Sequence, residues 1–220
     1  MVASRVLLTG FGPFPDVPDN PSGRLVETLG RSLRDSARQD FALHDTVLPT
    51  EWATLAAQIP CLHRELRPHL MVHFGVSPRA TGLRLERAAH NRIDSRPDAC
   101  GARPASSKIS KNGRERLETR LPVSDLAAQL RAQGHEARVS NSCGRYLCNA
   151  LYYRSLAWAD KHGGDALFVH VPLTRSQGGL CEEEALLRAS EATVTLAIQA
   201  MQLGAPSLSK TKETQRGVSA

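Results

Sequence analysis

The chain has 220 residues, of which 41% are hydrophobic and 23% are charged, and these ordinary globular proportions exclude intrinsic disorder and a collagen-like structure. No apolar run approaches the roughly 20 residues that a membrane-spanning helix needs, so no membrane partner is expected. The net charge of +6 comes from the segment Arg79–Arg120, where eleven basic residues stand against five acidic ones; this segment has no Phe, Tyr or Trp on which bases could stack, so no nucleic acid partner is expected.

Apolar runs bounded by turn residues alternate with amphipathic stretches in the first half of the chain. Leu25, Leu29 and Leu33 recur every fourth residue and form the buried stripe of a helix that Ser22 is expected to cap. Pro60 is expected to end or kink the next helix. In chain order, the pattern predicts a strand at Val6–Leu8, a helix from Ser22, a strand near Phe41–Leu48, a helix opened by Thr50 and a strand at Leu70–Val76.

The second half continues this alternation around one long polar stretch. Residues Asp94–Glu118 are rich in Ser, Pro and Arg without periodicity, so they are expected to form a surface loop. In chain order, the pattern predicts a strand at Leu83–His90, this loop, a helix capped by Ser124 that runs to Ala132 and is ended by Gly134, a strand at Ala137–Ser140, a helix from Gly144 or Arg145 to about Asp160, a strand at Ala166–Val171 and a helix at Glu182–Leu203. Such alternation predicts an α/β domain with a mostly parallel or mixed sheet and helices on both faces.

The glycine-rich turn after the first strand carries no nucleotide signature. Gly10-x-Gly12-x-x-Pro15 lacks the third glycine of a dinucleotide fingerprint, and the chain has no Walker A lysine, so no such cofactor is expected. Phe11 and Phe14 on this turn have two interpretations. They either pack into the core or form the walls of an apolar pocket at the carboxyl end of a strand, where open α/β sheets bind ligands.

The five cysteines are expected to be reduced thiols rather than parts of a disulfide or a structural zinc site. Their number is odd, they form no CxxC pair and they lack ligand spacing, so reduced thiols and no metal are expected. Cys148 lies where a strand passes through a turn into the first turns of a helix, so it is either a small packed residue, as most free cysteines are, or a reactive thiol whose thiolate the aligned amides favour. Cys143, on the turn itself, competes with it on spacing alone. The cysteines are Cys61, Cys100, Cys143, Cys148 and Cys181.

Two other polar residues stand in apolar surroundings. His170 ends a buried strand, so it is either a core histidine with a hydrogen-bond partner or a catalytic base. Glu86 either pairs with Arg84 on an exposed face or is a buried carboxylate that orients a histidine. A thiol, an imidazole and a carboxylate suffice for nucleophilic acyl transfer, but spacing does not show that these three groups meet.

Four sequence blocks occur in order along the chain: Leu8–Phe14 with Asn20–Ser22, His73–Ser77 with Leu85–Asn91, Ser140–Asn149, and Phe168–Pro172. They contain a glycine–phenylalanine turn, a Glu-Arg-x-x-x-Asn strand, a Gly-x-Tyr-x-Cys helix start and a His-x-Pro strand. Together, through about Met1–Leu203, they resemble pyroglutamyl peptidase I, the pyrrolidone-carboxylate peptidase family of cysteine exopeptidases.

The resemblance implies a hydrolase of the thiol protease class. Its members remove N-terminal pyroglutamate from peptides through an acyl-enzyme intermediate and need no metal or organic cofactor. Carried over to this chain, the motifs imply Cys148 as the nucleophile, His170 as the general base and Glu86 as the acid that orients the imidazole. Cys143 occupies a position where the family does not need a cysteine.

Four residues are expected to line the substrate pocket. The pyroglutamyl ring is a neutral lactam, so an apolar slot of Phe11 and Phe14 admits it and penalises a charged α-ammonium group. The resemblance adds Arg96, which matches a family arginine near the oxyanion, and Val76, which stands where many bacterial members have glutamine. Pro97 follows Arg96 where an aliphatic residue is usual, so turnover and specificity are expected to depend on Val76 and Pro97.

The resemblance also implies a single three-layer α/β/α domain. The catalytic domain is expected to span residues 1–206, followed by a polar, disordered tail at 207–220. The N-terminus lacks a secretory cleavage site, so a cytoplasmic location is expected. For assembly two states remain open, because many bacterial members are homotetramers and animal members are monomers. Two other functions also remain open: the same scaffold acting on another cyclic amide, and a non-catalytic binder of acidic partners through residues 79–120.

Overall fold

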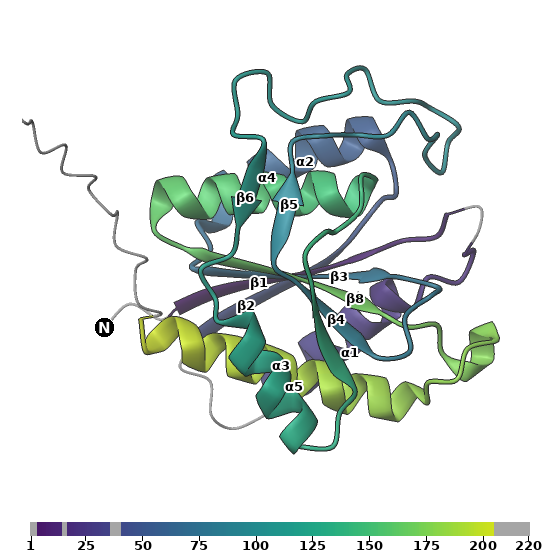
Figure 1. Ribbon diagram of the computed structural model, residues 1–220, viewed down its shortest axis with the longest axis vertical. Helices are drawn as coiled ribbons and strands as arrows, with labels where there is room; N and C mark the ends of the chain where they lie inside the picture. The colour runs from purple at the N-terminus through teal and green to yellow at the C-terminus, as the bar shows by residue number, and fades with distance from the viewer. Residues whose placement is uncertain (1–3, 15–16, 36–40, 205–220) are drawn as a thin grey trace, which may run out of the picture.

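The two middle strands of the central sheet, at residues 70–76 and 165–171, are almost entirely buried and mainly apolar. The structure is a computed structural model that describes residues 4–14, 17–35 and 41–204. Strands β2, β1, β3 and β8 are parallel, β4 is antiparallel to β8, and β7 is parallel to β4, so the sheet is mixed and mostly parallel, as predicted (Figure 1). In the order in which they lie, the strands are β2 (Phe41–Leu48), β1 (Ser4–Phe11), β3 (Leu70–Val76), β8 (Asp165–Val171), β4 (Leu83–Glu86) and β7 (Ala137–Ser140).

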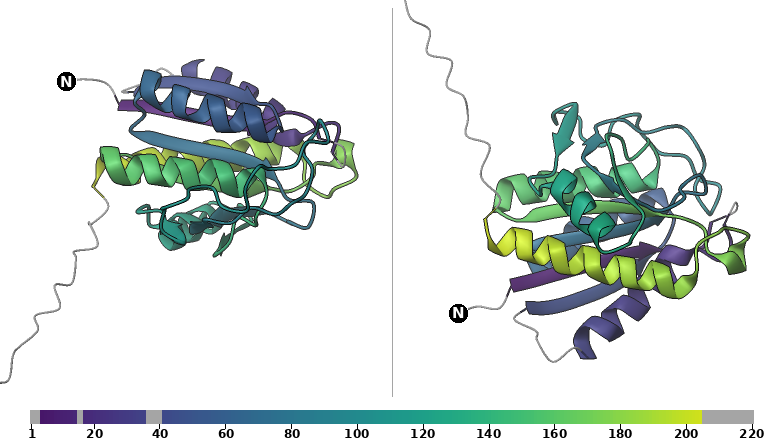
Figure 2. Two further views of the ribbon diagram at one scale, coloured as in Figure 1. Left: turned by 90° about the horizontal axis from the view of Figure 1, so that it is seen from above. Right: turned by 60° about the horizontal axis from the view of Figure 1, so that its bottom comes forward.

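Helices cover both faces of this sheet and give three layers, as Figures 1 and 2 show. The bounds are α1 (Pro21–Asp35), α3 (Val123–Ala132) and α5 (Glu183–Gln202) on one face, and α2 (Trp52–Leu66) and α4 (Leu147–His162) on the other. A single 3₁₀ turn at Arg175–Gln177 precedes α5. The predicted α/β fold with helices on both faces is confirmed.

Strand β8 shows how the pleat assigns side chains to the two cores. Successive residues of a strand point to opposite faces, so Leu167 and Val169 pack with α1, α3 and α5, whereas Phe168 packs with α2 and α4. His170 follows Phe168 by two residues and therefore shares its face. The imidazole thus lies on the side of the sheet that α2 and α4 cover.

The predicted strand Leu83–His90 is two strands. After β4 the chain leaves the main sheet, and β5 (Ala88–His90) pairs instead with β6 (Arg116–Glu118) in a small antiparallel sheet beside α4. The backbone of Arg87 marks the change, because its N–H donates to Ser140 of β7 and its carbonyl accepts from Thr119. A single strand is therefore wrong here, since the partner strand changes at Arg87.

The predicted cap of the first helix is wrong by two positions. Helix α1 begins at Pro21, and Ser22 is its second residue. The Oδ1 atom of Asn20 accepts hydrogen bonds from the Ser22 backbone N–H, at 3.1 Å, and from the Ser22 hydroxyl, at 2.8 Å. Asn20 thus caps the helix, and a proline at the first helical position suits this start because it has no N–H to satisfy.

The second helix also differs from its prediction. It begins at Trp52 rather than Thr50 and passes through Pro60 to Leu66, so the predicted end at Pro60 is wrong. Its cap comes from a distant loop, because the Trp52 backbone N–H donates to Asp98 Oδ2 at 2.9 Å. Thr50 does not cap the helix; its hydroxyl donates to the Gly12 carbonyl at 2.9 Å.

Helices α3 and α4 start close to their predicted positions. Helix α3 begins at Val123 with Pro122 before it, so Ser124 lies inside the helix and is not its cap. Helix α4 begins at Leu147, slightly later than the predicted Gly144 or Arg145. This start makes Cys148 the second residue of α4.

The predicted surface loop at 94–118 ends in β6 and is tied to the domain by side chains. Asn91, which is fully buried, accepts from the backbone N–H groups of Ile109 and Ser110 and donates to the carbonyls of Ser110 and Gly113. Asp98 accepts from the N–H groups of Cys100 and Ala102, as well as from Trp52. Hydrogen bonds from two buried polar residues therefore fix the path of this sequence without periodicity.

The predicted tail at 207–220 lies outside the described residues, as do residues 205–206 of the expected domain. Within the described part of the chain, every helix is too short or too polar to span a membrane.

Candidate active site

A cavity of about 500 Å³ opens at the carboxyl ends of β1, β3 and β8, beside the start of α4. This is the edge at which open α/β sheets bind ligands. All the predicted substrate-pocket residues and two of the three predicted catalytic residues line it: Phe11, Phe14, Val76, Arg96, Cys148 and His170. The third, Glu86, lies behind His170 and is fully buried.

His170 and Glu86 are brought together by the antiparallel pairing of β4 with β8. Register places Glu86 opposite Phe168, and Arg84 opposite His170, so these side chains share one face. His170 Nδ1 is hydrogen-bonded to Glu86 Oε1 at 2.7 Å. Of the two interpretations of Glu86, the structure therefore places the carboxylate inside the protein, against a histidine.

Glu86 also contacts Arg84. The two partners considered for Glu86, Arg84 and a histidine, are therefore both present. The Arg84 guanidinium lies 3.3 Å from Glu86 Oε1 and donates to the Ser140 hydroxyl at 3.0 Å. The second carboxylate oxygen, Oε2, is buried and has no hydrogen-bond partner among the described residues. Burying a charge without partners is costly, so the bonds of Oε1 to His170 and Arg84 are what stabilise an ionised Glu86.

Cys148 reaches the cavity from the first turn of α4, over the carboxyl end of β3. A Cβ atom placed on Gly75 would lie 3.1 Å from Cys148 Sγ and 2.8 Å from the Phe168 ring. Any residue larger than glycine would therefore displace the thiol or the ring. His170 contacts the same ring, with centroids 4.9 Å apart, so Phe168 and Gly75 together form the floor beneath the thiol and the imidazole.

Burial and charge act against each other on the Cys148 thiol. Burial raises the pKa of Cys148 to about 12, the guanidinium of Arg96 opposes this rise, and the carboxylate of Glu86 adds to it. The backbone N–H at Cys148 itself also lowers the pKa, as expected at a helix N-terminus, where no intrahelical acceptor exists for the first N–H groups. The protonated thiol is therefore the resting form, and a base must take its proton.

Cys143, the competing cysteine, also lines the cavity but is buried in its wall. Only 3% of its surface is exposed, and burial raises the pKa of its thiol well above the usual value. It packs with Leu147 and Tyr152 in the core between the sheet and α4. It lies before the helix begins, so the helix N-terminus does not favour its thiolate as it favours that of Cys148.

The phenylalanine turn is fixed by hydrogen bonds that the sequence pattern did not reveal. The Gly12 carbonyl accepts from Asn20, at 3.0 Å, and from Thr50. The Phe11 backbone N–H donates to the Ser22 hydroxyl at 3.1 Å. Phe11 is almost fully buried and Phe14 is partly exposed, so both interpretations hold: Phe11 belongs to the core and also walls the cavity.

Arg96 is held at the mouth by two aromatic residues that were not predicted. Its guanidinium carbon lies 3.7 Å from the centre of the Tyr146 ring, a cation–π contact. Trp52 Nε1 donates to the Arg96 carbonyl at 3.2 Å, and the Tyr146 hydroxyl donates to the Pro97 carbonyl at 2.9 Å. Trp52 and Tyr146 pack edge to face. Pro97 therefore contributes its carbonyl to the support of Arg96.

Asn149 is a second unpredicted residue of the site, although it directly follows the candidate nucleophile in a quoted motif. Its side chain is fully buried, donates to the carbonyls of His90 and Arg92 and accepts from the His90 N–H at 2.8 Å. A buried asparagine in the first turn of a helix needs such partners, and that requirement was the available signal. Asn149 ties the helix that carries Cys148 to β5.

Across the described residues, no three His, Cys, Asp or Glu side chains are grouped to bind a metal ion.

Comparisons with known proteins agree with this arrangement. The family model for pyroglutamyl peptidase matches residues 4–206. The chain is 36% identical over 170 residues to the pyroglutamyl-peptidase 1 of Homo sapiens, covering 76% of this chain and 78% of the relative. It is 34% identical over 177 residues to the pyrrolidone-carboxylate peptidase of Pseudomonas fluorescens, covering 78% and 80%.

Solved structures give the same result for the fold. The pyrrolidone carboxyl peptidase of Thermococcus litoralis superposes with a TM-score of 0.80 at 28% identity and covers 91% of this chain and 96% of that one. The enzyme of Thermus thermophilus gives a TM-score of 0.77 at 31% identity, with 89% and 99% covered. Because the family model matches residues 4–206 of the 220, the chain belongs to the pyroglutamyl peptidase family of cysteine peptidases.

Proposed function

We propose that this chain hydrolyses the amide bond that follows an N-terminal pyroglutamyl residue, with Cys148 as nucleophile, His170 as general base and Glu86 as positioning residue. One observation carries the proposal. The 2.7 Å hydrogen bond from Glu86 to His170 Nδ1 leaves the other imidazole nitrogen to the cavity that Cys148 lines. A carboxylate, an imidazole and a thiol in this relation are the minimum for nucleophilic acyl transfer.

The reaction begins from the protonated thiol. Because burial raises the pKa of Cys148 to about 12, the proton leaves as the sulfur attacks: Sγ bonds to the substrate carbonyl carbon while His170 Nε2 accepts the Sγ proton. The carbonyl electron pair moves onto oxygen, where the N–H groups at the start of α4 and the Arg96 guanidinium stabilise it. Glu86 stabilises the imidazolium that forms.

The imidazolium then returns its proton. It protonates the nitrogen of the departing amine as the carbon–nitrogen bond breaks, which leaves a thioester on Cys148. A water molecule next gives a proton to His170 and bonds to the thioester carbon. The carbon–sulfur bond breaks, Sγ recovers the proton from His170, and free pyroglutamate leaves.

Selection of the substrate follows from the absence of charge on the lactam ring. Phe11 and Phe14 provide apolar surface beside the nucleophile, and burying an ordinary N-terminal α-ammonium group against that surface would remove its hydration at a cost. Val76 lines the same cavity and, in our proposal, fills part of the ring site. The same features support pyroglutamyl substrates over other cyclic amides, because Val76 leaves less room for a larger ring.

The thiol also supports a cytoplasmic location. All five cysteines are free, and a catalytic Cys148 requires a compartment that keeps thiols reduced. We therefore propose that the protein acts in the cytoplasm on peptides that carry N-terminal pyroglutamate.

Two cysteine variants test the assignment. Cys148→Ala is expected to lower kcat/KM for a fluorogenic pyroglutamyl amide by about three orders of magnitude or more, because the nucleophile is lost. Cys143→Ala, the matched control in the same cavity wall, is expected to keep most of the activity. Iodoacetamide should inactivate both the wild type and Cys143→Ala, and a prolyl amide of the same fluorophore should not be cleaved.

The outcome that contradicts this proposal is equal loss in both variants while both remain folded by circular dichroism. Full activity of Cys148→Ala would exclude covalent catalysis at this residue. Cleavage of the prolyl amide at the rate of the pyroglutamyl amide would exclude the proposed selection of a neutral lactam.

A further inference from the structure

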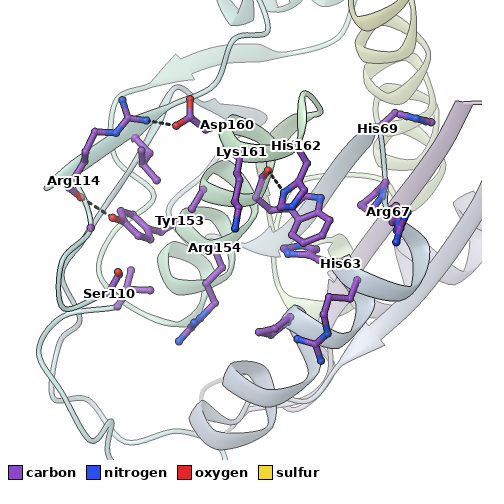
Figure 3. A pocket seen from close by; sticks show the side chains of 18 of the residues that line it. His63, Arg67, His69, Ser110, Arg114, Tyr153, Arg154, Asp160, Lys161 and His162 are labelled. Atoms are coloured by element: carbon purple, nitrogen blue, oxygen red, sulfur yellow. Dashed lines mark hydrogen bonds and ion pairs between the residues drawn. The ribbon is translucent and has the colours of Figure 1, made fainter.

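A second and larger cavity lies between α2 and α4, at the amino ends of β1 and β3. Its volume is about 960 Å³, and Figure 3 shows side chains from both helices around it. Cys148 is at the start of α4, and the residues of α4 that line this cavity begin at Tyr153 and end at His162, so they lie about 8 to 21 Å along the helix from Cys148 at a rise of 1.5 Å per residue. No step of the proposed peptidase reaction uses it.

The charge around this cavity is strongly one-sided. Among the described residues, six cationic side chains line it and only one carboxylate, Asp160, which already pairs with Arg114 at 2.9 Å. In the described part of the chain, Arg67, Arg154 and Lys161 have no carboxylate partner. The six are Arg5, Arg64, Arg67, Arg114, Arg154 and Lys161.

Two hydrogen-bond donors are buried in the wall without an acceptor. Arg154 Nε and Trp158 Nε1 are both shielded from solvent, and neither has a hydrogen-bond partner among the described residues. Most buried polar groups in proteins are paired, and leaving one unpaired costs about 1–3 kcal/mol. Arg154 and Trp158 lie one turn apart on α4 and both line the cavity, so an anion would supply acceptors to both donors once the two side chains rotate to expose these N–H groups.

The histidine that faces the cavity is affected by these positive charges in addition to its burial. Burial, together with the charges of His162 and Arg154, lowers the pKa of His63 to about 4. Burial also lowers the pKa of Arg154. Figure 3 shows His63, from α2, and Arg154 and Lys161, from α4, around this cavity. The cavity therefore favours a negatively charged occupant.

The aromatic residues in the wall limit what that occupant is. His162 stacks on Trp158 with ring centroids 3.6 Å apart, and His63 lies 5.2 Å from the same indole. With His162 stacked on the indole of Trp158 and His63 beside it, this indole does not offer an open face to a nucleobase. Recognition must then come from the charged and N–H groups, and the volume exceeds the need of a single monovalent ion.

We propose that this cavity is a binding site for a small multivalent oxyanion, a molecule with several phosphate or carboxylate groups, held by Arg154, Lys161 and the indole N–H of Trp158. The guanidinium of Arg154 offers paired donors to an oxyanion, and Lys161 adds a mobile point charge. The site is separate from the proposed peptidase activity and does not depend on it.

Calorimetric titration of the full chain tests the proposal. The probes are sodium tripolyphosphate, pyrophosphate and citrate, each at a constant ionic strength of about 0.15 M so that screening is the same in every run. At least one probe is expected to bind saturably with one site per chain. A polyphosphate that binds more tightly than citrate assigns a phosphate ligand, and the reverse order assigns a carboxylate ligand.

Three variants separate a built site from general attraction to a basic protein. Arg154→Gln is expected to weaken binding about tenfold, because a charge-assisted contact is lost. Trp158→Phe keeps the ring but removes the N–H, and it is expected to weaken binding about fivefold. Arg188→Gln removes an exposed charge on α5, paired only with Glu184, and serves as the matched control that leaves the affinity unchanged.

Thermal unfolding gives an independent readout. Without ligand, Arg154→Gln and Trp158→Phe are expected to be as stable as the wild type or more stable, since each removes an unpaired buried donor. The anion-induced rise in Tm should shrink in both. The proposal is overturned if no probe binds saturably, if binding occurs only to a long polyanion such as duplex DNA, or if Arg154→Gln and Arg188→Gln bind with the same affinity.

Discussion

Glu86 holds the imidazole of His170 through a single carboxylate oxygen. Oε1 accepts from His170 and lies 3.3 Å from Arg84, whereas Oε2 is buried without a partner. Replacing Glu86 by Gln keeps the size and removes the charge. The amide can still accept at its oxygen, but it no longer stabilises an imidazolium. We expect Glu86→Gln to lower kcat by more than about tenfold with a small change in KM.

The pH profile distinguishes this positioning role from a structural one. If Glu86 stabilises the charged imidazole, its loss shifts the acidic limb of kcat/KM to lower pH, because the imidazolium deprotonates more readily without the carboxylate. The matched control is Glu118→Gln, at an exposed glutamate of β6 that pairs with Arg116. If Glu86→Gln keeps the wild-type rate and an unshifted pH profile, Glu86 does not position His170 and its ion pair with Arg84 has only a structural role.

At the scale of elements, Asp98 connects the cap of α2 to the loop that carries Arg96. It is 3% exposed and accepts three backbone hydrogen bonds, from Trp52, Cys100 and Ala102. Asp98→Ala is expected to lower the free energy of unfolding by about 2 kcal/mol, because a helix cap is lost and buried N–H groups lose their acceptor. KM should also rise, since Arg96 lies two residues away in the same loop.

Urea unfolding and steady-state kinetics on the same preparations check this expectation. Glu184→Ala removes an exposed carboxylate on α5 and should change stability by no more than about 0.5 kcal/mol. An Asp98→Ala variant as stable as this control, with an unchanged KM, would show that the loop is positioned by other contacts.

The elements also show what local sequence determines. Strands at Phe41–Leu48, Leu70–Val76 and Ala137–Ser140 match the prediction to the residue. For Leu70–Val76 the reason is a mainly apolar run that fixes both ends of the strand. Helix starts were misplaced where the cap is not local. Asp98 caps α2 from 46 positions away, and no pattern around Thr50 contains that information.

The candidate site shows the same division. Local pattern located Cys148 at a helix start and His170 at the end of a strand. The contact of His170 with Glu86 depends on β4 running antiparallel to β8, a pairing between segments 84 positions apart that spacing does not specify. The resemblance to a family supplied the grouping. The sequence does not predict that Trp52 and Tyr146 support Arg96, because in the sequence alone these aromatic residues look like ordinary core residues.

At the scale of the whole molecule, a chain of buried polar groups links the sheet to α4 and α2. His73 is hydrogen-bonded to Thr9 and to Ser155, each at 2.8 Å, and Ser155 is 3.3 Å from His63 Nε2. Burial, with a further contribution from His63, lowers the pKa of His73 to about 3. For His63, burial and the charges of His162 and Arg154 lower the pKa to about 4.

These pKa values predict acid sensitivity of the fold. Well above pH 6.5, the ordinary pKa of histidine, both side chains are neutral in the folded and unfolded states and contribute nothing to the pH dependence. Below pH 6.5 the unfolded chain takes up protons that the folded chain does not, so the free energy of unfolding falls by up to about 1.4 kcal/mol per pH unit per histidine. The fall continues to about pH 4 for His63 and about pH 3 for His73.

Urea unfolding between pH 7 and pH 4 measures this slope. His63→Gln removes one of the two groups and is expected to make the slope shallower, whereas His44→Gln, at an exposed position on β2, is the control substitution. Equal slopes in the wild type and in His63→Gln would contradict the expectation.

The sequence left open that the basic segment at 79–120 as a whole binds acidic partners. In the structure, only some of its arginines lie at the catalytic cavity. Lys108 pairs with Glu115, and Arg103 donates to the Ser95 carbonyl, so neither lines the catalytic cavity. Four arginines do line it: Arg79, Arg84, Arg96 and Arg145, the last from the turn before α4. Among the described residues of the lining the only acidic one is Asp94. Arg84 pairs with the buried Glu86, so the positive charge at the mouth comes mainly from Arg79, Arg96 and Arg145.

A positive mouth should favour substrates with acidic residues after the pyroglutamyl group. Attraction at the mouth raises the encounter rate of an anionic peptide, and salt screens it. We expect kcat/KM for a pyroglutamyl peptide with two glutamates to fall as salt rises from about 20 to about 500 mM, while kcat/KM for a neutral pyroglutamyl amide stays nearly constant. Arg79→Gln combined with Arg145→Gln should flatten the first profile.

Lys111→Gln provides the control for this last expectation. Lys111 belongs to the same basic segment and is exposed, but it does not line the cavity, so its removal lowers the net charge of the protein without changing the mouth. Salt profiles that coincide for the two substrates would remove a role for charge at the mouth. A profile flattened as much by Lys111→Gln as by the double arginine variant would show that net charge, rather than the placement of Arg79 and Arg145, attracts the peptide.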